Sequence, residues 1–188
     1  MPQLLPPDQR LRAAPHLRPF HVVLVQPEIP PNTGNIARLC AATGCALHLV
    51  KPLGFQIDDH AVRRAGLDYW PLVELYVHAS LGEAESTISD LCLADHGRIP
   101  RSWLFSGRAQ HNIFELRLSV GDALVFGKES VGLDESLLNA RSDDAVAIPT
   151  AGPVRSLNLA NCVAIAVYES LRQNALTTTE IPGKISQG

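Results

Sequence analysis

The chain has 188 residues, of which 46% are hydrophobic and 19% are charged. This is the length of one globular domain, which buries an adequate core without disulfide bonds or a structural metal. Sixteen basic and nineteen acidic side chains give a formal charge of −3, which excludes a strongly polybasic nucleic-acid binder. The basic residues are 13 Arg and 3 Lys, however, and arginine suits bidentate contacts with phosphates and bases.

The two ends of the chain differ in composition from its middle. Five prolines fall within the first 19 residues, and no central apolar stretch marks a signal peptide. We therefore expect an irregular or disordered leader over 1–19, one domain over 20–174 and a flexible tail over 175–188. No apolar run reaches the roughly 20 residues of a membrane span.

The cysteines point to a reducing compartment. None of the four forms a CxxC pair or a zinc-type cluster with histidine, so we expect reduced thiols, a cytoplasmic protein and no bound metal. They are Cys40, Cys45, Cys92 and Cys162.

Short apolar runs alternate with helical patterns along the body of the chain. Strands are predicted over 21–25, 46–50, 72–77, 103–106, 123–126 and 145–148. Helices are predicted over 36–43, from Asp58 or Asp59 to Ala65, and over 80–93, 135–140 and 156–173. Such alternation predicts an α/β domain with a mostly parallel sheet and helices on both faces. Ligands of such sheets bind beyond the carboxyl ends of the strands, where three polar clusters occur.

The first cluster, from Asn32 to Arg38, leaves the first strand with the sequence NTGNIAR. Asn32 or Thr33 is expected to cap the following helix, and Gly34 permits a tight entry. Arg38 then lies within the first two turns, either as an ordinary surface residue or as a cation that faces a cleft.

The second cluster, FGKESVGL, follows the predicted strand 123–126. Gly127 is expected to let the backbone approach a ligand, although the segment also fits a simple turn. It matches neither a Walker A loop nor a GxGxxG fingerprint, which argues against a nucleoside triphosphate or a dinucleotide.

The third cluster runs from Ile148 to Asn161, through a Pro/Gly loop into the longest predicted helix. Ser156 is a plausible N-cap, which would favour polar ligands at the helix terminus. Asn158 and Asn161 then share one helix face, in a polar network that is either structural or functional.

Together the three clusters resemble the SPOUT-class RNA methyltransferases, in particular the family that 2′-O-methylates the wobble nucleotide, position 34, of tRNA. Asn32 and Arg38 match its first motif, Gly127 and Glu129 its second, and Ser156 and Asn158 its third. The segment His48–Trp70 also resembles the wobble-specific members. The resemblance extends over roughly residues 21–173.

The resemblance implies a deep C-terminal trefoil knot, a homodimer with its active site at the subunit interface, and S-adenosylmethionine as cofactor. The cofactor would lie among backbone groups and apolar side chains of three loops. These residues are Phe105, Ser106, Gly107, Gly127, Ile148, Ser156 and Leu157.

The resemblance also implies catalytic roles for Arg38, Glu129, Asn32, Ser156 and Asn158. Because a guanidinium stays protonated, Arg38 is expected to orient the ribose 2′-oxygen and stabilise its developing charge. Glu129 is expected to orient Arg38 or the substrate, and Ser156 and Asn158 to shape the pocket.

The substrate is expected to be the anticodon stem-loop of tRNA. The arginines expected to contact its phosphates are Arg63, Arg64, Arg108 and Arg155, with Arg98, Arg101 and Arg117 as further candidates. Two alternatives remain at this point: a ribose methyltransferase for rRNA or another tRNA position, and a non-catalytic RNA-binding relative.

Overall fold

Seven parallel strands form the central sheet of the computed structural model, which describes residues 10–55, 70–154, 156–176 and 179–180. Their order is β4-β3-β2-β7-β5-β8-β6, and each adjacent pair is parallel. The mostly parallel sheet predicted from the alternation is therefore confirmed. The strands are β2 (His21–Val25), β3 (Ala46–Val50), β4 (Leu75–His78), β5 (Ser102–Phe105), β6 (His111–Asn112), β7 (Ala123–Phe126) and β8 (Ala145–Ala147).

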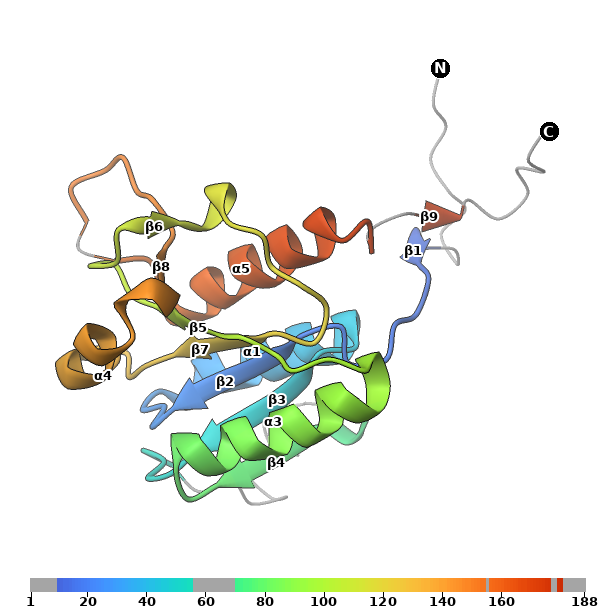
Figure 1. Ribbon diagram of the computed structural model, residues 1–188, viewed down its shortest axis with the longest axis horizontal. Helices are drawn as coiled ribbons and strands as arrows, with labels where there is room; N and C mark the ends of the chain where they lie inside the picture. The colour runs from blue at the N-terminus through green and yellow to red at the C-terminus, as the bar shows by residue number, and fades with distance from the viewer. Residues whose placement is uncertain (1–9, 56–69, 155, 177–178, 181–188) are drawn as a thin grey trace.

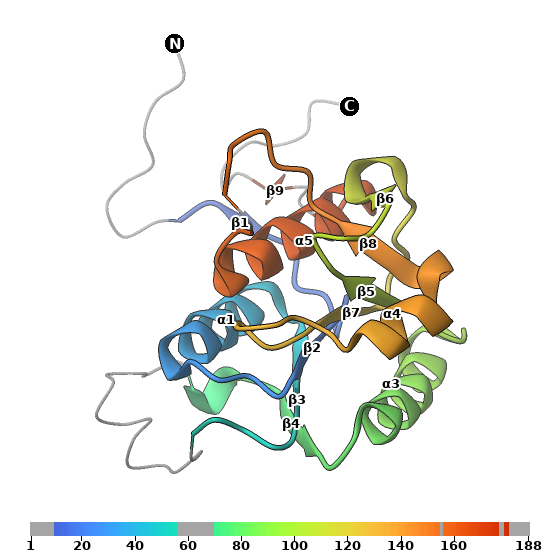
Figure 2. The ribbon, with the colours of Figure 1, turned by 90° about the vertical axis from the view of Figure 1, so that its left-hand side faces the viewer.

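Helices cover both faces of this sheet, as expected. Helices α1 (Pro30–Thr43) and α5 (Leu159–Gln173) pack on one face, and α3 (Leu81–His96) and α4 (Glu135–Ala140) lie on the other (Figures 1 and 2). Successive strand residues point to opposite faces, so they enter different cores. Trp103 and Phe105 join the core beneath α1 and α5, whereas Leu104 joins the core that includes residues of α3 and α4.

The predicted strand positions agree closely with the structure. The strands over 21–25, 46–50 and 123–126 and the helix over 135–140 have the predicted bounds, and β5 and β8 differ by one residue. The strand predicted over 72–77 begins only at Leu75, because Trp70–Leu72 forms a 3-10 turn. Helix α3 continues to His96, and the helix predicted from Asp58 or Asp59 to Ala65 lies outside the described residues.

The start of α1 corrects one prediction. The helix begins at Pro30, its N-cap residue is Ile29, and neither Asn32 nor Thr33 caps it. Prolines suit the first helical turn because their φ is already helical and their missing N–H is not needed there. Pro30 and Pro31 therefore lie in the first turn of α1, and Gly44, in a left-handed conformation, is the C-cap of the helix.

The start of α5 corrects a second prediction. The helix begins at Leu159, and its N-cap is Asn158, not Ser156. The Asn158 side chain accepts hydrogen bonds from the N–H groups of Ala160 and Asn161. Ser156 lies in the loop before the cap, where its side chain is exposed.

A chain of three buried histidines crosses strands β2, β3 and β4. His21 Nδ1 lies 3.0 Å from His48 Nε2, and His48 Nδ1 lies 3.0 Å from His78 Nε2. His48 also stacks on Tyr76, with ring centroids 4.8 Å apart. Burial lowers the pKa of His21 to about 4 and that of His48 to about 2, so these histidines are neutral at pH 7.

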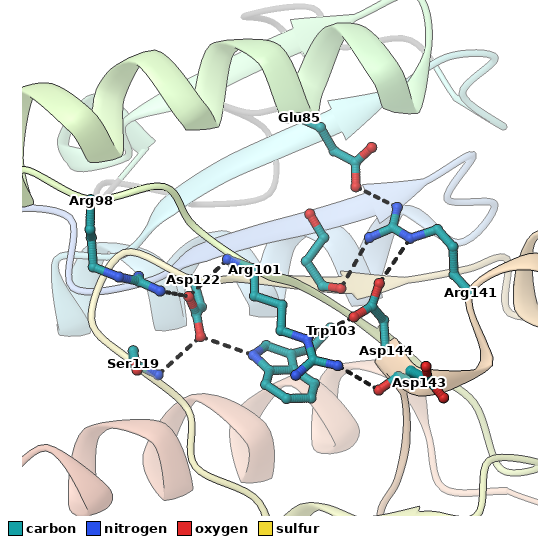
Figure 3. A network of polar contacts seen from close by, with 10 residues as sticks. Glu85, Arg98, Arg101, Trp103, Ser119, Asp122, Arg141, Asp143 and Asp144 are labelled. Carbon is teal, nitrogen blue, oxygen red and sulfur yellow. Dashed lines mark hydrogen bonds and ion pairs between the residues drawn. The ribbon is translucent and has the colours of Figure 1, made fainter.

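A charged network ties together the amino ends of β5, β7 and β8 (Figure 3). The carboxylate of Asp122 is 2% exposed and accepts four hydrogen bonds. Its donors are Arg98 Nη2, the backbone N–H groups of Arg101 and Ser119, and Trp103 Nε1. The Arg101 guanidinium stacks over the Trp103 ring at 4.0 Å and pairs with Asp144 at 2.7 Å.

The expected leader and tail meet in a small ribbon. Strand β1 (Arg12–Ala13) pairs antiparallel with β9 (Thr179–Glu180), and neither strand was predicted. Arg18, in the same leader, forms ion pairs with Glu74 and Asp95. In the described part of the chain, no helix combines the length and apolar character needed to cross a membrane.

Candidate active site

The segments that follow the strands leave the same edge of the sheet, because all of its strands run in one direction. Those that follow β3, β2, β7, β5 and β8 are neighbours in that order. The three predicted clusters follow β2, β7 and β8, so the topology brings them to one edge. This is where ligands of parallel sheets bind.

Glu129 joins the second cluster to the first. One of its carboxylate oxygens accepts the N–H of Glu28 at 2.8 Å. The other accepts the N–H of Ile29 at 3.2 Å and the side-chain amide of Asn32 at 3.1 Å. Because the N-cap residue Ile29 has no polar side chain, the carboxylate at the start of α1 comes from a residue 100 positions away.

Asn158 joins the third cluster to the first. Its side-chain oxygen caps α5, and its side-chain nitrogen donates to the Asn32 side-chain oxygen at 3.0 Å. Asn32 therefore stands between Glu129 and Asn158 in a continuous polar chain. Three segments far apart in the sequence are held together by these three side chains.

Glu28 and Ser130 form a second link between the first two clusters. The Glu28 carboxylate accepts the Ser130 N–H at 3.0 Å and the Ser130 hydroxyl at 2.9 Å. These hydrogen bonds lower the pKa of Glu28, so it is ionised at neutral pH. Glu28 thus binds the second cluster through its carboxylate while its backbone N–H donates to Glu129.

Gly127 is required by a close approach within the chain itself. A Cβ at this position would lie 2.1 Å from the carbonyl carbon of Gly132 and 2.2 Å from the Leu133 nitrogen. The segment closes on itself through hydrogen bonds between Lys128 and Gly132, 2.9 and 3.2 Å long. The close approach that Gly127 permits is therefore to the chain itself, and the expected approach to a ligand stays a prediction.

Arg38 lies on α1, and its side chain is exposed. Because the helix begins at Pro30, Arg38 occupies the third turn and not the first two as expected. Glu129 was expected to orient Arg38 or the substrate. The hydrogen bonds that the structure gives its carboxylate go to Glu28, Ile29 and Asn32, at the start of the helix that carries Arg38.

The expected cofactor residues lie at the end of β5 and on the loops that follow the neighbouring strands β7, β5 and β8. Phe105 is buried, and its ring stacks on that of Phe126 with centroids 4.5 Å apart. Its side chain is therefore part of the core. After it, Ser106 donates its backbone N–H to Val146, and Gly107 is exposed.

The remaining cofactor residues follow β8. Ile148 and Leu157 are half-buried, and Ser156 is exposed. Half-buried apolar side chains beside backbone groups at a strand edge suit a flat heterocycle such as adenine. The expected cofactor residues themselves offer backbone groups and neutral side chains. Among the described residues, no three His, Cys, Asp or Glu side chains are arranged to hold a metal ion.

The expected RNA-binding arginines are only partly described. Arg108 follows β5, is exposed, and pairs with Glu135 at 2.6 Å. Arg63, Arg64 and Arg155 lie outside the described residues. Arg98 and Arg101 lie at the opposite edge of the sheet, where they form ion pairs with Asp122 and Asp144.

Comparison with models of known protein families assigns the chain to a family. Residues 19–168 match the model of the SpoU rRNA Methylase family, which is most of the chain. The chain belongs to this family. This result confirms the relationship that the three clusters predicted.

Similar proteins of this family have been named and solved. The tRNA (cytidine(34)-2′-O)-methyltransferase of a Polaromonas species is 42% identical over 172 residues, which cover 90% of this chain and 99% of that protein. A structure described for the 2-OH methylation of C/U34 on tRNA is 46% identical, with a TM-score of 0.73, and the match covers 83% of this chain and 96% of that one. AviRb from Streptomyces viridochromogenes, solved with AdoMet, shares the fold at 24% identity and a TM-score of 0.71, over 86% of this chain and 60% of that one.

The sequence reasoning missed Glu28, Ser130 and Gly54. A Cβ on Gly54 would lie 2.8 Å from the Glu28 Cα, so the loop after β3 packs directly against the backbone of Glu28. Glu28 lies four positions before the start of the first cluster, and Ser130 lies immediately after Glu129. No local pattern reveals that these two residues are hydrogen-bonded, since they are 102 positions apart.

Proposed function

We propose that this SpoU-family protein transfers a methyl group from S-adenosylmethionine to the ribose 2′-oxygen of the tRNA wobble nucleotide, position 34, as cytidine or a modified uridine. The observation that carries the proposal is the Glu129–Asn32–Asn158 chain, which unites all three motifs at one sheet edge. The relative from Polaromonas, which carries this activity in its name, is matched over 99% of its length.

Arg38 is the proposed catalytic group. When bound, S-adenosylmethionine would supply an electrophilic methyl carbon on its sulfonium. Arg38 orients the 2′-oxygen that accepts the methyl group and stabilises the negative charge that develops on it during transfer. The hydroxyl proton goes to water or to the adjacent phosphate, because a guanidinium stays protonated.

The polar chain positions this group. Glu129 and Asn32 hold the first turn of α1, and Asn158 holds the start of α5 against it. Ser156 and Asn158 shape the loop after β8. Backbone groups of Ser106, Gly107, Gly127, Ile148 and Leu157 hold the cofactor, and the trefoil knot implied by the family resemblance lies in this part of the chain.

The proposal also includes a homodimer and a set of arginines that contact the RNA. Exposed apolar side chains occur beside α1 and on α5, where Ile29 is 45% and Tyr168 is 54% exposed. A second copy that covers these helices would add its own residues to the site. Arg63, Arg64, Arg108 and Arg155 contact the phosphates of the anticodon stem-loop, and the reaction takes place in the cytoplasm.

Mapping ribose methylation in tRNA tests the proposal directly. Deletion of the gene should remove the methyl group from position 34, and the purified protein should restore it. Loss of a methyl group only at another tRNA position or in rRNA would support the related ribose methyltransferase. A protein that does not bind S-adenosylmethionine at millimolar concentration would be a non-catalytic RNA-binding relative.

The Arg38→Ala variant tests the mechanism. We expect methyl transfer to fall about 100-fold or more while cofactor affinity changes little. Arg12→Ala, an exposed arginine on β1, is the matched control and should keep full activity. Turnover near that of the unmodified protein in Arg38→Ala would remove Arg38 from the mechanism.

A further inference from the structure

Glu28 exchanges hydrogen bonds with two successive residues of the second motif. Its carboxylate accepts both the N–H and the hydroxyl of Ser130, and its own N–H donates to Glu129. The Glu28 carboxylate therefore accepts hydrogen bonds from the segment of Glu129, and the Glu129 carboxylate accepts one from the backbone of Glu28. Such a reciprocal pair fixes the relative position of two loops more firmly than a single hydrogen bond does.

The backbone of Glu28 is held from a second side by the loop that follows β3. Gly54 donates its N–H to Pro27 at 2.9 Å. A Cβ on Gly54 would lie 2.8 Å from the Glu28 Cα and 2.9 Å from its carbonyl oxygen. Only glycine permits this contact without displacing the backbone that carries Glu28.

Glu28 contacts the tip of the turn 127–133. Hydrogen bonds between Lys128 and Gly132 close the base of this turn. Glu129 and Ser130 lie between them, and Ser130 is exposed. The contact of Ser130 with Glu28 therefore acts together with the hydrogen bonds of Glu129 to tie the tip to the loop before α1.

We propose that Glu28 is a positioning residue for methyl transfer: through Ser130 it holds Glu129 against the start of α1, the helix that carries Arg38. This inference rests on the proposed function. A tip that moves by about 1 Å would lengthen the three hydrogen bonds to Glu129, and a misplacement of that size can cost about 100-fold in rate.

A role limited to loop stability makes different predictions from a role in positioning. Positioning affects kcat, whereas loss of a surface hydrogen bond alone would lower stability and leave turnover per folded molecule unchanged. The matched control is Glu83, whose carboxylate accepts the Ala79 N–H at 2.8 Å before α3, outside the three motifs.

Steady-state kinetics on tRNA provide the first test. In Glu28→Gln we expect kcat to fall about tenfold, with KM for tRNA and cofactor affinity within about twofold. Ser130→Ala should lower kcat less, because the Ser130 N–H still donates to Glu28, whereas Ser130→Thr keeps the hydroxyl and should retain activity. The double variant should be no slower than Glu28→Gln alone, and Glu83→Gln should match the unmodified protein. An unchanged kcat in Glu28→Gln, or additive losses in the double variant, would overturn the inference.

Hydrogen exchange provides a second test that does not depend on activity. Glu28→Gln should increase amide exchange in peptides that span 28–38 and 127–133, but not in peptides of α3. If the unmodified protein does not methylate position 34, the proposed function fails, and the exchange data still decide whether Glu28 holds the two segments. Unchanged exchange in both peptides would show that Glu28 does not hold them.

Discussion

The two edges of the sheet hold carboxylates in different ways. At the amino edge, Asp122 is buried and pairs with the cation Arg98 in addition to three neutral donors (Figure 3). At the carboxyl edge, the carboxylate of Glu129 accepts hydrogen bonds from two backbone N–H groups and from the side-chain amide of Asn32. The amino edge thus compensates the charge of its central carboxylate with an arginine in direct contact.

This difference indicates a division of labour. The Asp122 carboxylate is buried and Arg98 is 34% exposed, so removal of the carboxylate leaves Arg98 and three neutral donors without their shared acceptor. The Glu129 carboxylate instead joins the loop after β7 to the start of α1. The amino edge is therefore organised for stability, and the carboxyl edge is organised to join the loops that carry the motifs.

Removal of Asp122 should have the largest effect on stability. We expect Asp122→Ala to lower the free energy of unfolding by about 3–5 kcal/mol, since Arg98 and the Trp103 N–H lose their shared buried acceptor. Urea unfolding measures this loss. Activity per folded molecule at low temperature should be unchanged, which separates this edge from the site.

Asp90→Ala is the control for this variant. Asp90 is exposed on α3, so its removal should change the free energy of unfolding by about 0.5 kcal/mol or less. Equal losses in the two variants would show that the amino-edge network does not carry the stability assigned to it.

Acid should destabilise the folded protein because it protonates the buried histidines. The pKa of His21 is lowered to about 4 in the folded protein, against about 6.5 when unfolded, so the unfolded chain binds more protons between these values. The contribution of neutral His21 to the free energy of unfolding is therefore fully present above pH 6.5, and it is lost as the pH falls toward 4. His21 alone should account for a loss of about 2 kcal/mol between pH 7 and pH 5, and His48 acts in the same direction.

Urea midpoints at pH 7, 6 and 5 measure this dependence. His111→Gln changes an exposed histidine and should keep the same slope. A stability that does not change between pH 7 and pH 5 would contradict neutral, buried His21 and His48.

Asn158→Ala should lower activity more than stability, whereas Asp122→Ala should lower stability and leave activity unchanged. Loss of the α5 cap should lower the free energy of unfolding by only about 1 kcal/mol. Methyl transfer should fall much further, because the same side chain links the third motif to Asn32. Thermal unfolding together with single-turnover methylation shows which loss is larger, and a rate that falls only as far as the folded fraction would contradict a role in the site.

Arg108→Ala should have the smallest effect on stability. Its ion pair with Glu135 is exposed on both sides, and such pairs contribute little to folding. If Arg108 contacts a phosphate, the variant should bind tRNA more weakly and reduce the salt dependence of binding by about one ion. An unchanged salt dependence would exclude this contact.

The sequence predicted the elements better than their boundaries. Strands such as 21–25 and 123–126 are short β-branched or apolar runs that are buried on both faces, so their extent follows from composition. The start of α1 did not follow in this way, because the carboxylate that binds its first N–H groups is Glu129, from another loop. The sequence predicts the N-cap of α5 at Ser156, two residues before the observed cap, Asn158. The reason is related, because the Asn158 side chain both caps the helix and donates to Asn32 in another segment.

By itself the sequence determined the alternation of strands and helices, and hence the parallel sheet and the edge at which its three motifs gather. It also determined which residue types those motifs carry. Only the tertiary structure decided how the motifs join: Glu129 to Asn32, 97 positions apart, and Asn158 to Asn32, 126 positions apart. The physical reason is that a hydrogen bond depends on distances of about 3 Å, which the order of strands in the sheet sets and local sequence does not.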